Sequence, residues 1–306
     1  MKLSIIPAHS KGASDFSDSR EGIFWILNYM AIALVVFLMI ASVFTLFIYS
    51  FPAFKSFGLK LFFGNEWDPE NSIFGGFPFI VGTLITSFIA LLICIPFSLS
   101  LSLFMGQYYP DGRISKFLRN AVDLLASIPS VIYGFWGLLI LAPCIQSIEM
   151  KYDILPYGVG IFTASLLLSV MIIPYASSLG STIIKMVPKE IKEAAIALGA
   201  TPFETVRYIV IPKAFSGILA GIFLSFARAL GETMAVTMVI GNANRIPESI
   251  FSPGNTLASL IANEFTEATG NQYVSALIAM AFILLIISSV FNIAGKLIIM
   301  KWSDNK

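Results

Sequence analysis

The chain has 306 residues, of which 57% are hydrophobic and only 12% are charged. Soluble domains have about 45–50% apolar and about 25% charged residues, so this composition excludes an ordinary soluble core. With one histidine, His9, and no G-x-x-x-x-G-K-[ST] motif, the chain offers no basis for a histidine-based catalytic or metal site or for a P-loop nucleotide site, and we expect no cofactor on it.

Long apolar runs predict an all-α membrane protein with six transmembrane helices. Five runs contain no Asp, Glu, Lys or Arg, and a sixth contains only Arg228 and Glu232. The five uncharged runs are 24–49, 72–109, 124–148, 154–184 and 268–295, and the sixth is 214–244. Each exceeds the ~20 residues that a helix needs to cross a bilayer. Cys94 and Cys144 lie within these runs and are expected to pack as free thiols.

The basic residues predict the orientation of the chain in the membrane. Fourteen Lys and Arg fall in the N-terminal tail, the 110–123 and 185–213 loops and the C-terminus, against four on the other side. Loops rich in Lys and Arg stay in the cytoplasm. We therefore expect a multi-pass protein of the cytoplasmic (inner) membrane with both termini in the cytoplasm.

In chain order, the expected parts follow from these runs. They are a polar tail at 1–22, a first transmembrane helix at 23–50, an extracytoplasmic loop at 51–73, one helical domain at 74–300 and a tail at 301–306. The helical domain includes the cytoplasmic loop at 185–213 and an extracytoplasmic loop at 242–272. In the latter, Thr256 is expected to cap a short helix that lies on the membrane surface or against a partner, with Glu264 on its outer face. Prolines in the spans indicate either helices bent around a pathway or ordinary packing kinks.

The loop at 185–213 has the pattern of a polar helix-turn-helix. Its first helix carries a narrow apolar stripe at i, i+3, i+4 and i+7, formed by Ile191, Ala194, Ala195 and Leu198. Gly199 follows where a left-handed cap is expected, and Thr201 with Glu204 forms a capping box for the second helix. Small residues on an exposed stripe allow the backbone of another protein to approach closely. The pattern predicts a docking surface, or else a surface helix pair with nothing docked on it.

The sixth apolar run contains the pair Arg228 and Glu232. Arg228 is expected near mid-bilayer, where inserting it costs roughly 2.5–3.5 kcal/mol on translocon scales. Glu232 would lie one helical turn further on the same face. Such residues face a bundle interior or a water-filled cavity, and the planar fork of an arginine suits a tetrahedral oxyanion. The alternative is a salt bridge that pins this helix to a neighbour; both roles can hold at once.

These residues carry a resemblance to a known family. The spacing E-A-A, three residues, Gly, nine residues, I-x-I-P from Glu193 to Pro212 resembles the coupling loop of ABC importer permeases. The run R-A-L-G-E-T-M-A-V at 228–236 is more specific and resembles phosphate-specific permeases. The segments at 75–84 and 124–134 also resemble phosphate-specific permeases. The segment L-A-S-L-I-A-N-E-F at 257–265 resembles the C-type subunit, PstC. The similarity covers about residues 65–295.

The resemblance implies a type I ABC importer permease fold for the 74–300 domain. It implies a heterodimer with an A-type permease, a dimeric cytoplasmic ATPase that binds ATP and Mg, and an extracytoplasmic phosphate-binding protein, with no nucleic acid. Arg228 and Glu232 would lie on the phosphate path, with Glu232 holding Arg228 and keeping anion binding weak. The docking helix would present Glu193, Ala194, Ala195, Leu198 and Gly199 to the ATPase. The chain itself would not be an enzyme.

Three other functions are alternatives to a phosphate permease. The first keeps the permease and changes the cargo to sulfate, molybdate or phosphonate. An ion-gradient-driven carrier is opposed by the lack of an inverted repeat and by the helix pair devoted to docking. A membrane enzyme is opposed by the lack of a His, Cys and Asp constellation in the spans.

Overall fold

The structure is a computed structural model that describes residues 14–304 of the chain. The chain separates into two units, residues 1–49 and 50–306. Helix α1 (Ser14–Phe57) makes up the described part of the first unit and extends into the second. Residues 14–22, expected in the tail, are therefore helical, and the helix continues past residue 50. Residues 1–13 of that tail, with His9, lie outside the described residues.

Six helices in the described residues are long and apolar enough to cross a membrane. They are Phe24–Phe57, Phe77–Tyr108, Ser130–Lys151, Ile161–Lys185, Pro202–Leu230 and Asn271–Trp302. The prediction of an all-α protein with six spans is confirmed. The last helix, α13 (Asn271–Asp304), also includes the first described residues of the tail expected at 301–306.

Two spans begin and end elsewhere than the apolar runs predicted. The third begins at Ser130 because the chain leaves the helical conformation at Ile128, as a residue before proline is biased to do. Residues 124–127 instead end the amphipathic helix α4 (Arg113–Ser127). The fifth span begins at Pro202 and ends at Leu230, since the helix stops at Gly231, a residue of low helix propensity.

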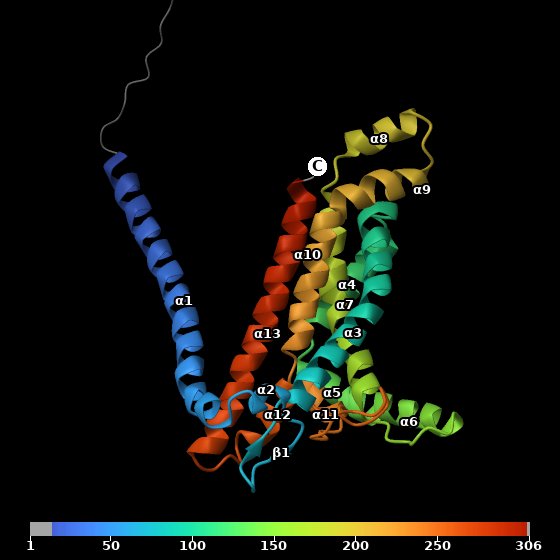
Figure 1. The fold of residues 1–306 in the computed structure, drawn as a ribbon. Helices are drawn as coiled ribbons and strands as arrows, with labels where there is room; N and C mark the ends of the chain where they lie inside the picture. Colours follow the sequence, from blue (N-terminus) through green and yellow to red (C-terminus); the bar gives the residue numbers. More distant parts are fainter. Residues whose placement is uncertain (1–13, 305–306) are drawn as a thin grey trace, which may run out of the picture. The chain divides into compact units, whose positions relative to one another are not determined.

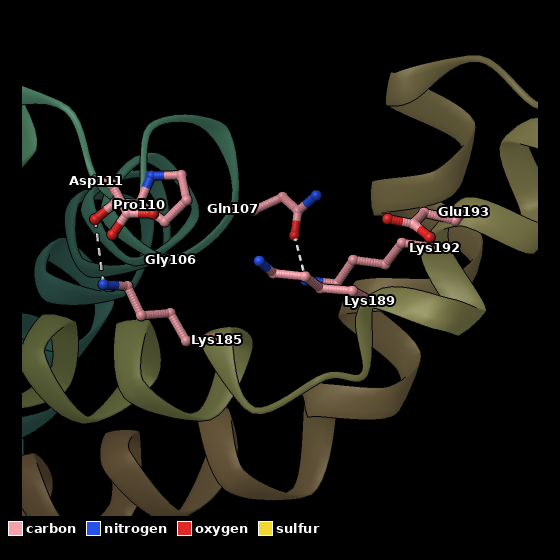
Figure 2. A pocket seen from close by; sticks show the side chains of 8 residues that line it. All are labelled: Gly106, Gln107, Pro110, Asp111, Lys185, Lys189, Lys192 and Glu193. Carbon is pink, nitrogen blue, oxygen red and sulfur yellow. Dashed lines mark hydrogen bonds between the residues drawn. The ribbon is translucent and has the colours of Figure 1, made fainter.

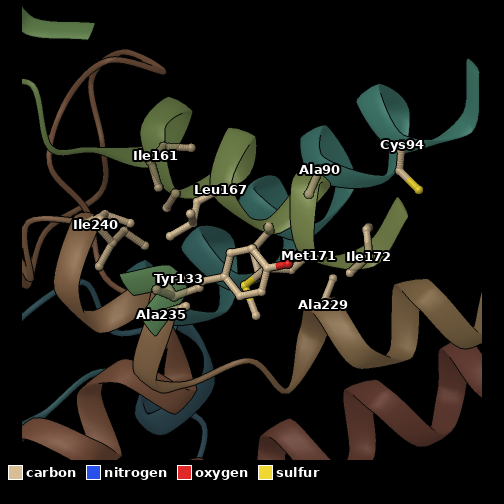
Figure 3. Packing of buried hydrophobic residues seen from close by; sticks show 14 of the residues in the cluster. Ala90, Cys94, Tyr133, Ile161, Leu167, Met171, Ile172, Ala229, Ala235 and Ile240 are labelled. Carbon is tan, nitrogen blue, oxygen red and sulfur yellow. The ribbon is translucent and has the colours of Figure 1, made fainter. Parts of the chain in front are cut away.

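Helix α7 (Ile161–Lys185) is the centre of the second unit. It packs against α3 (Phe77–Leu103) and α10 (Ile211–Leu230), and its buried side chains form a core with residues of both helices. Figure 3 shows Leu167, Met171 and Ile172 of α7 in this core, with Ala90 of α3 and Ala229 of α10 around them. The cysteines are free: Cys94 is buried here and Cys144 is exposed.

Short elements join these helices at the two ends of the second unit. The π-helical turn η1 (Phe104–Tyr108) follows α3 and precedes α4. The third span is built from α5 (Ser130–Trp136), the π-helical turn η2 (Gly137–Leu141) and α6 (Ala142–Lys151). Between α7 and α10 lie α8 (Lys189–Ala197), α9 (Pro202–Thr205) and the π-helical turn η3 (Val206–Val210). Figure 1 places α8 and α9 at one end of α10 and α11 (Met234–Val239) at the other.

The region expected as a loop at 51–73 is ordered. After α1 come α2 (Lys60–Phe63) and an antiparallel pair of strands, β1 (Trp67–Asp68) and β2 (Ile73–Phe74), in which Trp67 faces Phe74. Trp67 and Phe74 are buried in a second core with residues of α3, α12 and α13. The Asp68 carboxylate accepts hydrogen bonds from Asn71, which lower its pKa below the ordinary value.

Helix α12 (Leu257–Glu264) corrects one prediction for the loop at 242–272. Thr256 caps it, as predicted, by accepting a hydrogen bond from the Ser259 amide at 3.1 Å. Its apolar residues are nevertheless buried within this chain, since the helix packs against α3, α11 and α13. The loop that precedes it lies directly on α3, where a Cβ at Gly82 would collide with the Asn255 carbonyl.

Glu264 explains how that loop is held. It was predicted on the outer face, but it is half-buried and accepts hydrogen bonds from Trp67 Nε1 at 2.7 Å and Tyr273 Oη at 2.7 Å. Asn244 Nδ2 donates a third at 3.2 Å. Three segments far apart in the sequence therefore converge on one carboxylate, and hydrogen bonds to a charged acceptor are the stronger kind.

Candidate functional site

Arg228 lies in the last turn of α10, and Glu232 lies beyond the end of that helix. Gly231 ends α10, Thr233 follows, and α11 starts at Met234. The prediction that the two charges stand one turn apart on a continuous helix is therefore wrong. Among residues 14–304, no carboxylate forms an ion pair with Arg228, so the described chain offers no salt bridge by which Arg228 could pin α10.

The partner of Arg228 is an aromatic ring instead. Its guanidinium carbon lies 4.3 Å from the centre of the Tyr175 ring, a cation–π distance. Tyr175 sits near the middle of α7, so Arg228, although it is in the last turn of α10, lies beside the middle of a membrane-crossing helix. No hydrogen bond joins the guanidinium N–H groups of Arg228 to a residue of the described chain, so these donors are available to an oxyanion.

Two tyrosines connect this arginine to the break between α4 and α5. Tyr175 Oη donates to the Ala126 carbonyl at 2.8 Å, and Tyr133 Oη donates to the Leu125 carbonyl at 2.9 Å. The last carbonyls of a helix have no partner within it, and inside a membrane each needs another donor. Tyr175 thus supplies a donor to the Ala126 carbonyl near the break at Pro129. Tyr133 adds a second donor to the Leu125 carbonyl, which also accepts from the Ile128 amide at 3.3 Å. Tyr175 also contacts Arg228. Neither tyrosine was among the predicted site residues.

An apolar cavity of about 280 Å³ adjoins Tyr133, one of these two tyrosines, and is lined also by Ile132, Trp136 and Val170. The Arg228 side chain is exposed. Glu232 is half-buried. A guanidinium on a membrane-embedded apolar face is costly when it faces lipid, so such residues face protein or water. The arrangement therefore fits a face that is covered by another helical subunit and that receives an anion there.

The loop between α7 and α10 folds locally as predicted. Gly199, at φ +93°, has the left-handed conformation that ends α8. Thr201 and Glu204 form the capping box of α9: the Thr201 amide donates to the Glu204 carboxylate at 2.8 Å, and the Glu204 amide donates to Thr201 Oγ1 at 3.3 Å.

The orientation of α8 differs from the predicted stripe at one residue. Glu193, Ala194 and Leu198 are exposed, and Leu198 is 90% exposed. Ala195 is only 7% exposed, because the helix rests on α9 and η3 with this side inward. The surface open to a partner thus runs along Glu193, Ala194 and Leu198, and Ala195 packs within the chain.

A small core supports this helix pair. Ile184 and Val187 at the end of α7 pack with Val210, Ala214 and Ile218, which lie at and beyond the start of α10. This core joins the ends of α7 and α10 next to the segments that lead into α8 and out of α9. Among the described residues, no group of His, Cys, Asp and Glu has the arrangement of a metal site.

Comparisons with known proteins show the family of the chain. Residues 98–303 match the family model described as binding-protein-dependent transport system inner membrane component. A relative from Pasteurella multocida, named phosphate transport system permease protein PstC, is 41% identical over 88% of this chain and 88% of its own length. A relative of the same name from Mesorhizobium japonicum is 38% identical over 92% and 90%. A bacterial alginate ABC transporter, solved with an alginate-bound periplasmic protein, has a similar fold with a TM-score of 0.59 at 17% identity, covering 89% of this chain and 92% of that one.

Proposed function

The chain belongs to the family of binding-protein-dependent transport system inner membrane components, and we propose that it is a permease subunit of an ABC importer for inorganic phosphate. The observation that supports phosphate as the cargo is the position of Arg228. It is a cation held on an aromatic ring, beside the middle of α7. Relatives with high coverage that are named as phosphate permeases support the same cargo.

The proposed partners follow from three features of the chain: it has no P-loop nucleotide site, and both Arg228 and one surface of α8 are exposed. We propose that the face around Arg228 is covered by a second, A-type permease subunit, and that the pathway lies between the two. The exposed surface of α8 docks a dimeric ATPase, which holds the ATP and Mg. An extracytoplasmic phosphate-binding protein delivers the anion on the opposite side. In this proposal α8 and both termini lie on the cytoplasmic side, and the protein is in the cytoplasmic (inner) membrane.

The proposed mechanism involves two parts of the chain, the loop between α7 and α10 and the contact of Arg228 with Tyr175. Closure of the ATPase dimer moves α8 and α9, and the small core at Ile184 and Val210 transmits that movement to α7 and α10. Arg228 offsets the desolvation of phosphate at mid-membrane through charged, in-plane hydrogen bonds. Tyr175 holds the guanidinium, the role first expected of Glu232. Glu232, two residues beyond α10, weakens anion binding by repulsion and so permits release.

The cargo is tested by competition in whole cells. Uptake of radiolabelled phosphate by a strain that lacks other phosphate importers and carries this transporter is measured with excess unlabelled phosphate, sulfate, molybdate or phosphonate. Only unlabelled phosphate should suppress the signal strongly. Stronger suppression by another of these oxyanions would assign the permease to that anion instead.

Transport should require a separate ATPase chain. Reconstituted alone in liposomes, the chain should accumulate no phosphate under an imposed proton or sodium gradient, because the proposed importer is driven by ATP hydrolysis and this chain has no P-loop nucleotide site. The matched sample contains the second permease, the ATPase and the binding protein, with ATP on the ATPase side. Gradient-driven accumulation by the chain alone would support a carrier.

Tyr175 should affect transport through its ring more than through its hydroxyl. Tyr175→Leu removes the cation–π contact, worth roughly 0.5–2 kcal/mol, and is expected to lower the uptake rate by about tenfold. Tyr175→Phe keeps the ring and should retain most of the activity. Tyr152→Leu, at an exposed tyrosine away from the site, is the control. Equal loss in the Phe and Leu variants at normal membrane levels would show that the hydroxyl bond to Ala126, and not the stacking, is what matters.

A further inference from the structure

A cavity of about 350 Å³ lies between the start of α8 and the turn that follows η1. Three lysines line it: Lys185 at the end of α7, and Lys189 and Lys192 of α8. Figure 2 shows the three side chains around the open space, with Gln107 and Pro110 on the opposite wall. The Arg228 site and the exposed surface of α8 do not use these lysines.

The ammonium groups in this cavity have few partners. Lys192 Nζ donates to Gln107 Oε1 at 2.7 Å, and Lys185 Nζ donates to the Pro110 carbonyl at 3.2 Å. Both acceptors are neutral, and each ammonium has three donors. The carboxylates of Asp111 and Glu193 also line the cavity, but among residues 14–304 neither forms an ion pair with a lysine.

The surroundings of Lys192 and Lys189 disfavour the charged form of these lysines unless an anion is present. Lys192 is half-buried, and burial, together with repulsion by Lys189, lowers its pKa below the ordinary value. Lys189 is the first residue of α8, whose N-terminal cap, Pro188, makes no side-chain hydrogen bond. The N-terminus of a helix carries partial positive charge and unpaired N–H groups, so it favours anions and disfavours cations. An anion in the cavity would relieve each of these unfavourable features.

We infer that this cavity binds a phosphate group, from free phosphate or from the headgroup of an anionic phospholipid, through Lys185, Lys189 and Lys192. The volume is at the lower end of the range of about 300–1,000 Å³ typical of small-molecule sites, which suits a hydrated phosphate or a headgroup. A phosphate group bound in this way bridges α7 and α8, and so braces the docking helix against a transmembrane helix. The inference rests on the residues of this cavity and holds whatever the transporter carries.

Lysine labelling tests the inference at the site itself. The full chain, purified with the subunits that accompany it, is placed in nanodiscs of phosphatidylcholine with chloride, of phosphatidylcholine with inorganic phosphate, or of phosphatidylcholine with phosphatidylglycerol and chloride. Ionic strength is matched, an amine-reactive reagent is added briefly, and modification of each lysine is measured by mass spectrometry. Lys116, exposed on α4 outside the cavity, is the internal reference.

The expected result is protection of the three cavity lysines relative to Lys116. Labelling should fall about threefold once the anion reaches twice its dissociation constant, because the free fraction is 1/(1 + [L]/Kd). Protection by phosphate assigns free phosphate as the ligand, and protection by phosphatidylglycerol alone assigns the lipid headgroup. Lys192→Gln should remove the protection of Lys185 and Lys189, whereas Lys116→Gln should leave it unchanged.

Three outcomes would overturn the inference. Equal labelling in all nanodiscs would show that no phosphate group binds. Parallel loss of labelling at Lys116 would reduce the effect to general charge screening. Protection already complete in phosphatidylcholine with chloride would show that a partner chain covers the lysines.

Discussion

Arg228→Gln is expected to lower phosphate uptake by at least about 30-fold, because truncating one member of a desolvated, hydrogen-bonded charge pair, here Arg228 with the transported phosphate, costs about 2–5 kcal/mol. Glutamine can still donate hydrogen bonds, but it removes the charge that offsets desolvation of the anion. Arg228→Lys keeps the charge and loses the planar fork, so intermediate uptake is expected. The measurement is the initial rate of radiolabelled phosphate uptake in cells without other phosphate importers, normalised to the amount of each variant in the membrane.

The matched control is Arg113→Gln, at an exposed arginine that starts α4, and it should leave uptake within about twofold, as surface substitutions do. A double variant, Arg228→Met with Glu232→Gln, separates substrate binding from a structural role. The two charges form no ion pair in the described chain, so the double variant should reach the membrane and still fail to transport. Uptake by the double variant at the unmodified rate would contradict a role for Arg228 in the pathway.

Local features of the fold could be predicted because neighbouring residues determine them. The left-handed Gly199 and the capping box of Thr201 and Glu204 depend on a few adjacent residues, and both are present. Helix breaks inside apolar runs were missed. Pro129 lies inside the uncharged run 124–148 and Gly231 inside the largely apolar run 214–244, so composition indicates a continuous span where the chain leaves the helix. The spacing of Arg228 and Glu232 was misinterpreted for the same reason.

The candidate site was predictable only in part, because its remaining members come from distant segments. Arg228 is evident as a charge in an apolar run, but no spacing connects it to Tyr175 on another helix. The sequence alone does not show whether Glu264 faces solvent, because its hydrogen-bond partners Trp67 and Tyr273 are brought beside it only by the fold. On α8, a narrow stripe of apolar residues does not reveal which side rests on the chain itself. Only the packing of α8 on η3 shows that Ala195 faces inward.

That orientation determines the sharpest test of the docking surface. Leu198→Asp is expected to weaken ATPase binding by at least about tenfold, since it loses the burial of a leucine, worth about 1.5–3 kcal/mol, and adds an unpaired charge to the interface. Leu198 is 90% exposed in the chain alone, so the substitution should leave the fold intact. The measurements are retention of the ATPase by the tagged chain after purification, and phosphate uptake by the same cells; both should fall.

Leu155→Asp is the matched control, because Leu155 is 67% exposed in the loop between α6 and α7, at the opposite end of α7 from α8. It should retain the ATPase fully. Ala195→Asp supplies a different contrast: a charge at a residue that is only 7% exposed disturbs the packing of α8 within the chain, so less protein should reach the membrane. Leu198→Asp should instead reach the membrane at the normal level and fail in coupling alone. If Leu198→Asp retained both the ATPase and uptake, the exposed surface of α8 would not be the docking site, and the helix pair would be an undocked surface feature.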